Sequence, residues 1–269
     1  MLKQRIATAA ALLALFLAAN FLLSTFAWGV LILLPIALGA WEWGALAGFS
    51  RTGHAIFVAV VVASCVALLF AGAGAATEPA AGVIALSLAA VFWCTVAPIW
   101  LLRAWHVRAP TALAGVGWLL LVPCWYGAVV LHRSPAQLLA FLLVVWIADS
   151  AAYFVGRRYG RRKLAPAISP GKTWEGVGGA FAAVLMYGLF LQRVLTPDEA
   201  GLRGIALYLL LASMTALGIV GDLFESWMKR QAGVKDSGTL LPGHGGVLDR
   251  IDALTAAVPL AALWILLGR

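Results

Sequence analysis

Long apolar runs, interrupted by short polar segments, follow one another along the whole chain. Each is long enough to cross a hydrocarbon core of ~30 Å as a helix that rises ~1.5 Å per residue, and strand-type alternation is absent. The pattern predicts nine transmembrane helices, at approximately 6–24, 26–48, 54–72, 80–102, 111–131, 135–155, 176–192, 204–221 and 253–268. The first two runs almost touch, so either they form a tight hairpin or one of them enters the membrane only partway.

Lysine and arginine fall unevenly on the two sides that these helices define. With the N-terminus in the cytoplasm, 15 of the 19 Lys and Arg residues lie in cytoplasmic segments. Cytoplasmic loops are expected to hold this excess, which favours a cytoplasmic N-terminus and an external C-terminus. This topology places the two longest polar segments, 156–175 and 222–252, on the same cytoplasmic side.

Composition supports a membrane protein and excludes a water-soluble one. Of the 269 residues, 63% are hydrophobic and 11% are charged, whereas soluble domains have roughly 25% charged residues. We therefore expect one all-α polytopic membrane domain, with N-terminal helices in 1–131 and the helices and cytoplasmic loops that include both long polar segments in 132–269. The net charge of +8 comes mostly from Lys and Arg in the cytoplasmic segments. It therefore indicates contact with anionic membrane lipid rather than with nucleic acid.

Tryptophan residues gather near the predicted helix ends. Trp28, Trp41, Trp43, Trp100 and Trp105 are examples among the twelve. Indole rings favour the membrane interface, so we interpret these side chains as anchors without a ligand role.

Charge is scarce in the chain except in the segment 222–252. Five of the 11 acidic residues lie there with four cations and one histidine: Asp222, Glu225, Asp236, Asp249, Asp252, Lys229, Arg230, Lys235, Arg250 and His244. A helix that continues to about residue 229 would put Asp222, Ser226 and Lys229 on one face, with Glu225 beside Lys229. The alternative is an ordinary ion-paired helix end, but a carboxylate at the membrane boundary is costly without a cation, metal or water partner.

A glycine-rich break at residues 242–246 precedes the last predicted helix. Its backbone N–H groups could form a nest for an anion, and a plain turn is the alternative. Asp249 and Asp252 follow on one helix face and can converge with Asp222 on the preceding helix. Oxygen ligands without cysteine favour Mg²⁺, and the nearby cations suit phosphate oxygens. The pattern thus indicates phosphoryl or nucleotidyl transfer at a membrane surface.

The residues of this segment also form a recognisable motif. They are Ser226, Lys229, Arg230, Lys235, Asp236, Gly238, Pro242, His244, Gly245, Gly246, Asp249, Arg250 and Asp252. In order and spacing they resemble the signature of the CDP-diacylglycerol synthase, or phosphatidate cytidylyltransferase, family, as do the segments 149–157, 169–176 and 221–226. The resemblance is close in the C-terminal half and general in the N-terminal half.

The resemblance implies a reaction in which CTP and phosphatidate give CDP-diacylglycerol and pyrophosphate. It implies Mg²⁺, alone or with a second cation, and an enzyme of the bacterial inner membrane with a cytoplasmic active site, for which a homodimer is one expected assembly. Two alternatives stay open. One is a cytidylyltransferase for another lipid phosphate, such as prenyl glycerol phosphate; the other is an ion-coupled transporter, which would have acids near mid-bilayer and an internal repeat.

The resemblance also suggests catalytic roles. Asp222 and Asp249 would hold the metal, with additional ligands from Asp236 and Asp252. The cations and the hydroxyl of the motif would complete the catalytic group around the phosphates: Ser226, Lys229, Arg230, Lys235 and Arg250. His244 would donate to a phosphate oxygen or stabilise its turn.

A second group is expected to bind substrate: Gly245, Gly246, Ser169, Lys172, Thr173 and Asp149. The run Gly171–Thr173 is not a P-loop, because Pro166 stands where that motif needs a glycine. Asp149, inside its span, would line the pocket or orient Lys172. For Glu42, which is also placed inside a span, a polar pocket and snorkelling to the interface are equally supported.

Overall fold

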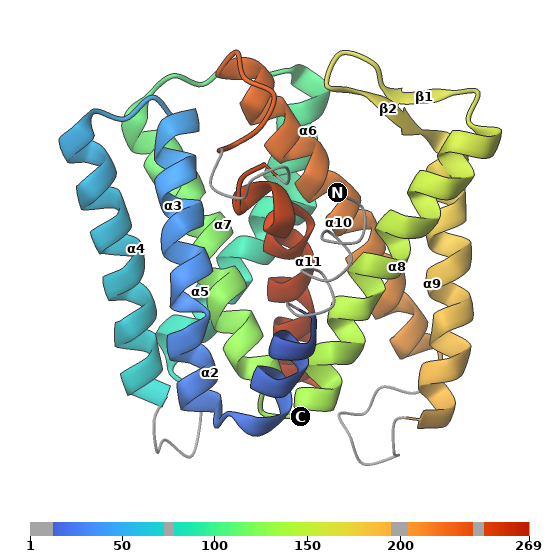
Figure 1. Ribbon diagram of the computed structural model, residues 1–269, viewed down its shortest axis with the longest axis horizontal. Coiled ribbons are helices and arrows are strands. Elements are labelled where there is room, and N and C mark those ends of the chain that lie inside the picture. Colours follow the sequence, from blue (N-terminus) through green and yellow to red (C-terminus); the bar gives the residue numbers. More distant parts are fainter. Residues whose placement is uncertain (1–12, 73–77, 195–203, 239–244, 269) are drawn as a thin grey trace.

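The computed structural model describes residues 13–72, 78–194, 204–238 and 245–268, which form a bundle of long helices with one small hairpin (Figure 1). An apolar helix, Leu13–Leu22, comes first. The elements that follow are α2 (Thr25–Leu31), α3 (Leu33–Leu46), α4 (Arg51–Gly72), α5 (Ala80–Val91), the π-helical turn η1 (Phe92–Val96), α6 (Ala97–Arg103), α7 (Pro110–Leu131), α8 (Pro135–Tyr159), β1 (Lys163–Ala165), β2 (Ser169–Thr173), α9 (Trp174–Val194), α10 (Ile205–Gln231) and α11 (Leu248–Leu267).

Eight helical stretches among the described residues are long and apolar enough to cross a membrane. They coincide with eight of the nine predicted spans, with α2 and α3 forming one stretch and α5, η1 and α6 another. The first predicted span, 6–24, begins outside the described residues, and its described part is the short helix Leu13–Leu22. The all-α polytopic fold is thus confirmed.

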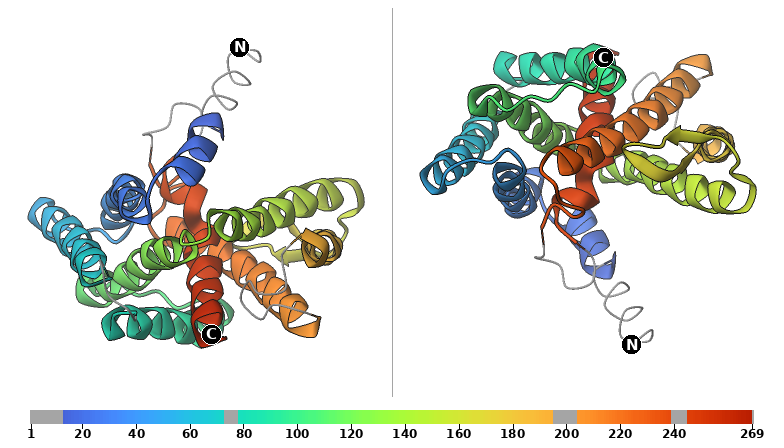
Figure 2. Two further views of the ribbon diagram at one scale, coloured as in Figure 1. Left: turned by 90° about the horizontal axis from the view of Figure 1, so that it is seen from below. Right: turned by 90° about the horizontal axis from the view of Figure 1, so that it is seen from above.

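The last helix, α11, runs through the middle of the bundle and packs against α10, α7, α5 and α8 (Figure 2). The β1–β2 hairpin lies at one end of the bundle, which we call the hairpin end (Figure 1). The start of α11 and the end of α10 lie toward that same end. The described parts of the two polar segments, 156–175 and 222–252, are therefore close in space, as the charge pattern predicts.

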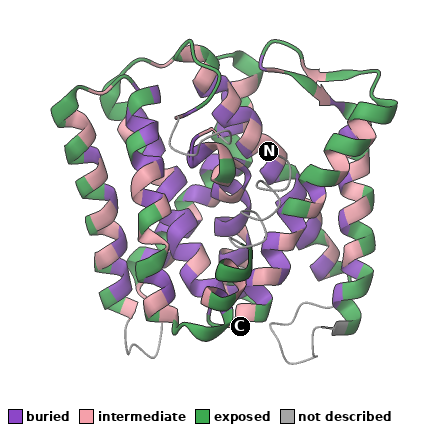
Figure 3. Cartoon of the chain, in the orientation of Figure 1, coloured by how far each residue is buried: buried purple, intermediate pink, exposed green. Residues whose placement is uncertain are grey.

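Burial follows the bundle geometry. Side chains that face the middle of the bundle are buried, whereas the outer faces of α4 and α9 are exposed (Figure 3). Those outer faces carry large apolar side chains such as Ile56, Phe70, Met186 and Phe190. An apolar exterior of this kind matches a lipid solvent.

The interpretation of the tryptophans as interface anchors is wrong for several of them. Trp28, Trp43 and Trp100 are buried inside the bundle, whereas Trp41 and Trp105 are exposed. The indole nitrogen of Trp43 donates to the carbonyl oxygen of Leu113, at 2.9 Å. A buried indole is stable where its N–H finds such a partner, so nearness to a helix end does not by itself indicate an anchor.

The polar segment 156–175, for which no strand was predicted, contains the antiparallel pair β1 and β2. It is held where α8 and α9 cross closely. A Cβ on Gly176 would lie 2.8 Å from the carbonyl oxygen of Ala152 and 3.5 Å from the Cα of Gly156. Only glycine at this crossing lets the two backbones come so close. The hairpin, which joins α8 to α9, therefore lies against the end of α8.

Candidate active site

A cavity of about 720 Å³ opens between α8, α9, α10, α11 and the hairpin. Its polar wall comes from residues far apart in the sequence: Asp149, Tyr153, Arg157, Lys163, Ser169, Lys172, Thr173, Asp222, Asp249 and Asp252. Asp222 lies nine residues before the end of α10, or about 14 Å along the helix axis. The cavity therefore extends from the hairpin end into the bundle and is lined by charged side chains. Acidic residues at this depth need partners.

One lysine faces three acids in this cavity. The Nζ atom of Lys172, on β2, lies 2.5 Å from Oδ2 of Asp222, on α10. Asp149 and Asp252 also interact electrostatically with Lys172, and each of them is repelled by Asp222. Asp149, Asp222 and Asp252, from three helices, thus line one cavity with Lys172, as the sequence predicts for Asp222 with Asp252 and for Asp149 with Lys172.

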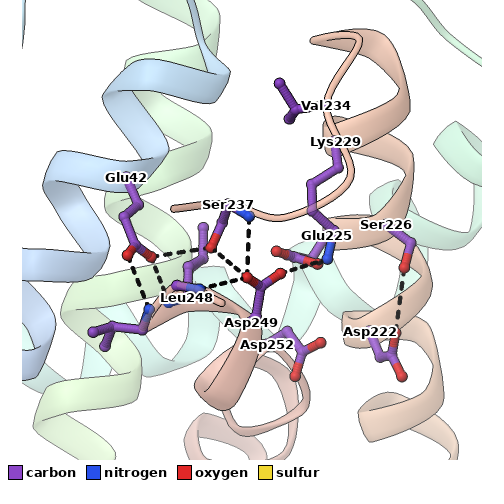
Figure 4. Close-up of polar contacts among 12 residues, drawn as sticks. Glu42, Asp222, Glu225, Ser226, Lys229, Val234, Ser237, Leu248, Asp249 and Asp252 are labelled. Atoms are coloured by element: carbon purple, nitrogen blue, oxygen red, sulfur yellow. Dashed lines mark hydrogen bonds and ion pairs between the residues drawn. The ribbon is translucent and has the colours of Figure 1, made fainter. Parts of the chain in front are cut away.

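A second, more buried charge cluster joins α10 to α11. The Nζ atom of Lys229 lies 2.5 Å from Oε2 of Glu225 and 2.6 Å from Oδ1 of Asp249 (Figure 4). The side chains of Lys229, Glu225 and Asp249 are only 12%, 3% and 10% exposed. The predicted pairing of Glu225 with Lys229 is confirmed, and the lysine also holds the first turn of α11.

The other carboxylate oxygen of Asp249 is occupied as well. Oδ2 accepts from the backbone N–H of Ser237 at 3.0 Å, from the Ser237 hydroxyl at 3.0 Å and from the N–H of Gly246 at 2.8 Å. Asp249 is in the first turn of α11, where free backbone N–H groups and the helix dipole favour a negative charge. Its contacts therefore fix the start of α11.

Carboxylates of the chain itself accept from three successive amides at Gly246, Val247 and Leu248, beside the glycine-rich break. The Gly246 N–H donates to Asp249, and those of Val247 and Leu248 donate to Glu42. Two carboxylates thus lie within reach of one helix N-terminus. The substrate role expected of Gly245 and Gly246 stays a prediction: a bound phosphate would have to replace Asp249 as the acceptor of the Gly246 amide.

Thr173 has a structural contact that the sequence analysis did not foresee. Its hydroxyl oxygen accepts from the N–H of Gly176 at 3.1 Å, and the residue is buried directly before α9. This is the geometry of a helix N-cap. Thr173 thus fixes the turn from β2 into α9 while lining the cavity beside Ser169 and Lys172.

Several predicted site residues lie away from the cavity wall in the part of the chain that is described: Ser226, Arg230, Lys235, Asp236 and Arg250. The Ser226 hydroxyl is 3.4 Å from Oδ1 of Asp222, and the guanidinium of Arg230 donates to the carbonyl oxygen of Ile168 beside the hairpin. Lys235 and Asp236 are exposed on the loop after α10. His244 lies outside the described residues.

The donor chemistry of the cavity fits a hard divalent cation. Asp222 and Asp252 offer carboxylate oxygens on one wall, and Mg²⁺ is commonly held by one or two carboxylates together with substrate phosphates. No cluster of three or more His, Cys, Asp or Glu side chains suited to a metal occurs in the described ranges. Asp249, with both oxygens engaged, is less suited as a ligand than Asp252.

Glu42 also contacts the site region, although its position in the sequence left a polar pocket and snorkelling equally supported. Glu42 is buried on α3, in the N-terminal half, and contacts the loop and helix that carry the motif. The available signal was a glutamate within an apolar run. That signal does not identify its partners, which lie about two hundred residues later in the chain.

Comparison with known proteins agrees with the motif. The model of the cytidylyltransferase family matches residues 3–267. A phosphatidate cytidylyltransferase of Pseudomonas aeruginosa is 43% identical over 276 residues, covering 98% of this chain and 97% of that protein. One from Haemophilus influenzae is 36% identical over 282 residues, covering 96% of each. A Thermotoga maritima protein of the same name is 43% identical over 129 residues, or 47% of each chain. The chain therefore belongs to the cytidylyltransferase family.

Proposed function

We propose that this protein transfers the cytidylyl group of CTP to phosphatidate, giving CDP-diacylglycerol and pyrophosphate. The observation that carries the proposal is the cavity that holds Lys172, Asp149, Asp222 and Asp252 at the hairpin end of an apolar bundle. Its position lets a water-soluble nucleotide and a lipid headgroup meet. Full-length relatives named for the same reaction support this assignment.

The reaction needs alignment and charge neutralisation more than it needs a base. A phosphate oxygen of phosphatidate forms a bond to the α-phosphorus of CTP, while the bond from that phosphorus to the bridging oxygen breaks and pyrophosphate leaves. The attacking phosphate is already anionic at neutral pH. The chain must therefore hold two polyanions in line and stabilise the charge on the leaving group.

Three cations on the cavity wall suit that task. Lys172 and Lys163 come from the hairpin, and Arg157 comes from the last turn of α8. Lys172 is neutralised by Asp222 in the structure, so a bound phosphate competes with this carboxylate for the ammonium group. Ser169 lines the same wall and supplies a hydroxyl donor.

Mg²⁺, alone or with a second cation, would be held by Asp222 and Asp252, and it would neutralise phosphate charge when bound. The excess of carboxylates over cations around Lys172 favours such an ion. Asp249, the other ligand expected from the motif, would have to give up a present donor to take part.

The membrane placement follows from the apolar exterior and the eight membrane-length helices. We place the protein in the bacterial inner membrane, with the hairpin end in the cytoplasm where CTP is available. The basic run 157–163 at this end suits anionic lipid headgroups. The homodimer stays a prediction, which the mass of the protein in detergent solution tests.

The test is product formation by the purified protein in detergent, supplied with CTP, Mg²⁺ and phosphatidate. We expect CDP-diacylglycerol and equimolar pyrophosphate. Prenyl glycerol phosphate in a parallel reaction tests the alternative lipid substrate. Absence of product from phosphatidate, with a folded protein and several detergents, contradicts the proposal, and product from prenyl glycerol phosphate alone would support the alternative lipid substrate.

A further inference from the structure

Glu42 lies in the N-terminal half of the chain, which the motif does not reach. It is on α3 and only 6% exposed, and it is not one of the residues that line the cavity. Figure 4 shows its carboxylate directed at the segment that leads into α11. A buried carboxylate in a membrane protein is costly, so its partners indicate why it is there.

Both carboxylate oxygens of Glu42 accept hydrogen bonds from the start of α11. Oε1 accepts from the N–H of Val247 at 2.9 Å, and Oε2 accepts from the N–H of Leu248 at 2.7 Å. These are among the backbone donors that a helix leaves unpaired at its N-terminus. Glu42 thus supplies, from another helix, the anion that stabilises this end of α11.

The surrounding backbone is shaped to the carboxylate. A Cβ on Gly238 would lie 2.5 Å from Oε1 of Glu42, and a Cβ on Gly246 would lie 2.5 Å from Oε2. A larger residue at either position would displace the glutamate. Two glycines of the motif are therefore explained by close packing against Glu42.

Ser237 links Glu42 to the charge cluster. Its hydroxyl oxygen is 3.0 Å from Oε2 of Glu42 and 3.0 Å from Oδ2 of Asp249. A hydroxyl has one proton, so it donates to one of these oxygens at a time. The contacts form a continuous series from Glu42 through Ser237 and Asp249 to Lys229.

We propose that Glu42 is a positioning residue: by binding the first amides of α11 and Ser237, it holds Asp249 and Asp252 in place at the cavity. The proposal rests on the proposed function. It gives the N-terminal helices a defined part in the reaction, since α3 contributes the anchor for the catalytic end of α11. The expected consequence of weakening this anchor is slower turnover, with little change in nucleotide affinity.

The test compares Glu42→Gln, Glu42→Asp and the control Glu78→Gln in detergent. Glu78 is also a shielded carboxylate, but it pairs with Arg133 and accepts from Tyr126. In Glu42→Gln an NH₂ group takes the place of one carboxylate oxygen. The backbone N–H of Val247 or Leu248 then faces a donor instead of an acceptor. We expect kcat to fall about tenfold or more while KM for CTP changes less than about twofold. Glu42→Asp should recover part of kcat, and Glu78→Gln should keep it.

Two further measurements separate positioning from a general loss of folding. Glu42→Gln and Ser237→Ala should lower kcat less than additively in combination, because they act through one series of contacts. Amide hydrogen exchange at residues 246–249 should be faster in Glu42→Gln, and exchange elsewhere should be unchanged. Wild-type kcat in Glu42→Gln, or unchanged exchange at 246–249, overturns the inference. If the wild-type protein makes no product, the proposed function fails, and the exchange result still decides the role of Glu42.

Discussion

Lys172 and Asp222 form an ion pair between the hairpin and α10, with Nζ and Oδ2 2.5 Å apart. Their side chains are 24% and 32% exposed, so both groups remain open to the cavity. Asp149 and Asp252 share the field of this one lysine. The pair therefore joins the segment expected to bind phosphate to the carboxylates expected to hold the metal.

Lys172→Met should weaken substrate binding. The variant removes the cation that pairs with Asp222 and attracts Asp149 and Asp252, so phosphate loses an attractive partner and meets uncompensated carboxylates. A charged hydrogen bond is worth about 1.5–3 kcal/mol, and we therefore expect KM for CTP to rise roughly tenfold to hundredfold. Steady-state kinetics checks this, with Arg51→Met on α4 as the control. Equal KM values for Lys172→Met and the wild type would remove Lys172 from the substrate site.

Lys229→Met should destabilise the protein. It leaves Glu225 and Asp249 close together, nearly buried and without their cation. Breaking a buried ion pair by removing one partner costs about 3–5 kcal/mol. We expect a clearly lower unfolding temperature in detergent, with partial recovery when Glu225→Gln is added. A single variant as stable as the wild type would show that the cluster does not hold α10 to α11.

Thr173→Ala should lower stability and Thr173→Ser should not. Alanine removes the acceptor for the Gly176 N–H, whereas serine keeps it. Loss of an N-cap costs about 1 kcal/mol. Unfolding measured for both variants checks the cap. If Thr173→Ser loses activity while its stability is unchanged, the threonine methyl group also has a part in the cavity.

Removing divalent cations should abolish turnover reversibly. Chelation followed by dialysis should leave a folded protein that makes no product, and added Mg²⁺ should restore the rate. In Asp252→Asn the Mg²⁺ concentration for half-maximal rate should rise, because one oxygen ligand is weakened. Full activity without divalent cation, or an unchanged Mg²⁺ requirement in Asp252→Asn, would contradict the assignment of Asp222 and Asp252 to the metal.

Much of the fold could be predicted from the sequence because a bilayer imposes a simple length rule. Eight predicted spans reappear as helices, and α10 continues beyond the predicted span 204–221 to Gln231, close to the helix end expected near residue 229. Gly233, with a φ of +73°, follows the helix end. The hairpin was missed because its strands are only three and five residues long and carry no alternation.

The site was predictable where one helix carries the pattern and unpredictable where partners come from elsewhere. The i,i+4 spacing predicts the contact of Glu225 with Lys229, and it is present. The motif did not indicate that Asp249 is saturated by Lys229, Ser237 and Gly246. The role of Glu42 was ambiguous because Val247 and Leu248 contact it through their backbone amides. A pattern of side chains does not indicate contacts of this kind.

Whether this cavity is the active site is decided by the rate at which Asp222→Asn converts CTP and phosphatidate to CDP-diacylglycerol, measured beside the wild type. Asparagine keeps the shape of the side chain but removes the charge that faces Lys172. Because Asp222 also repels Asp149 and Asp252, we expect the loss of its charge to cost little stability. We expect an unchanged unfolding temperature with a rate at least about a hundredfold lower. An Asp222→Asn protein whose rate is within about twofold of the wild type would contradict the assignment of this cavity as the active site.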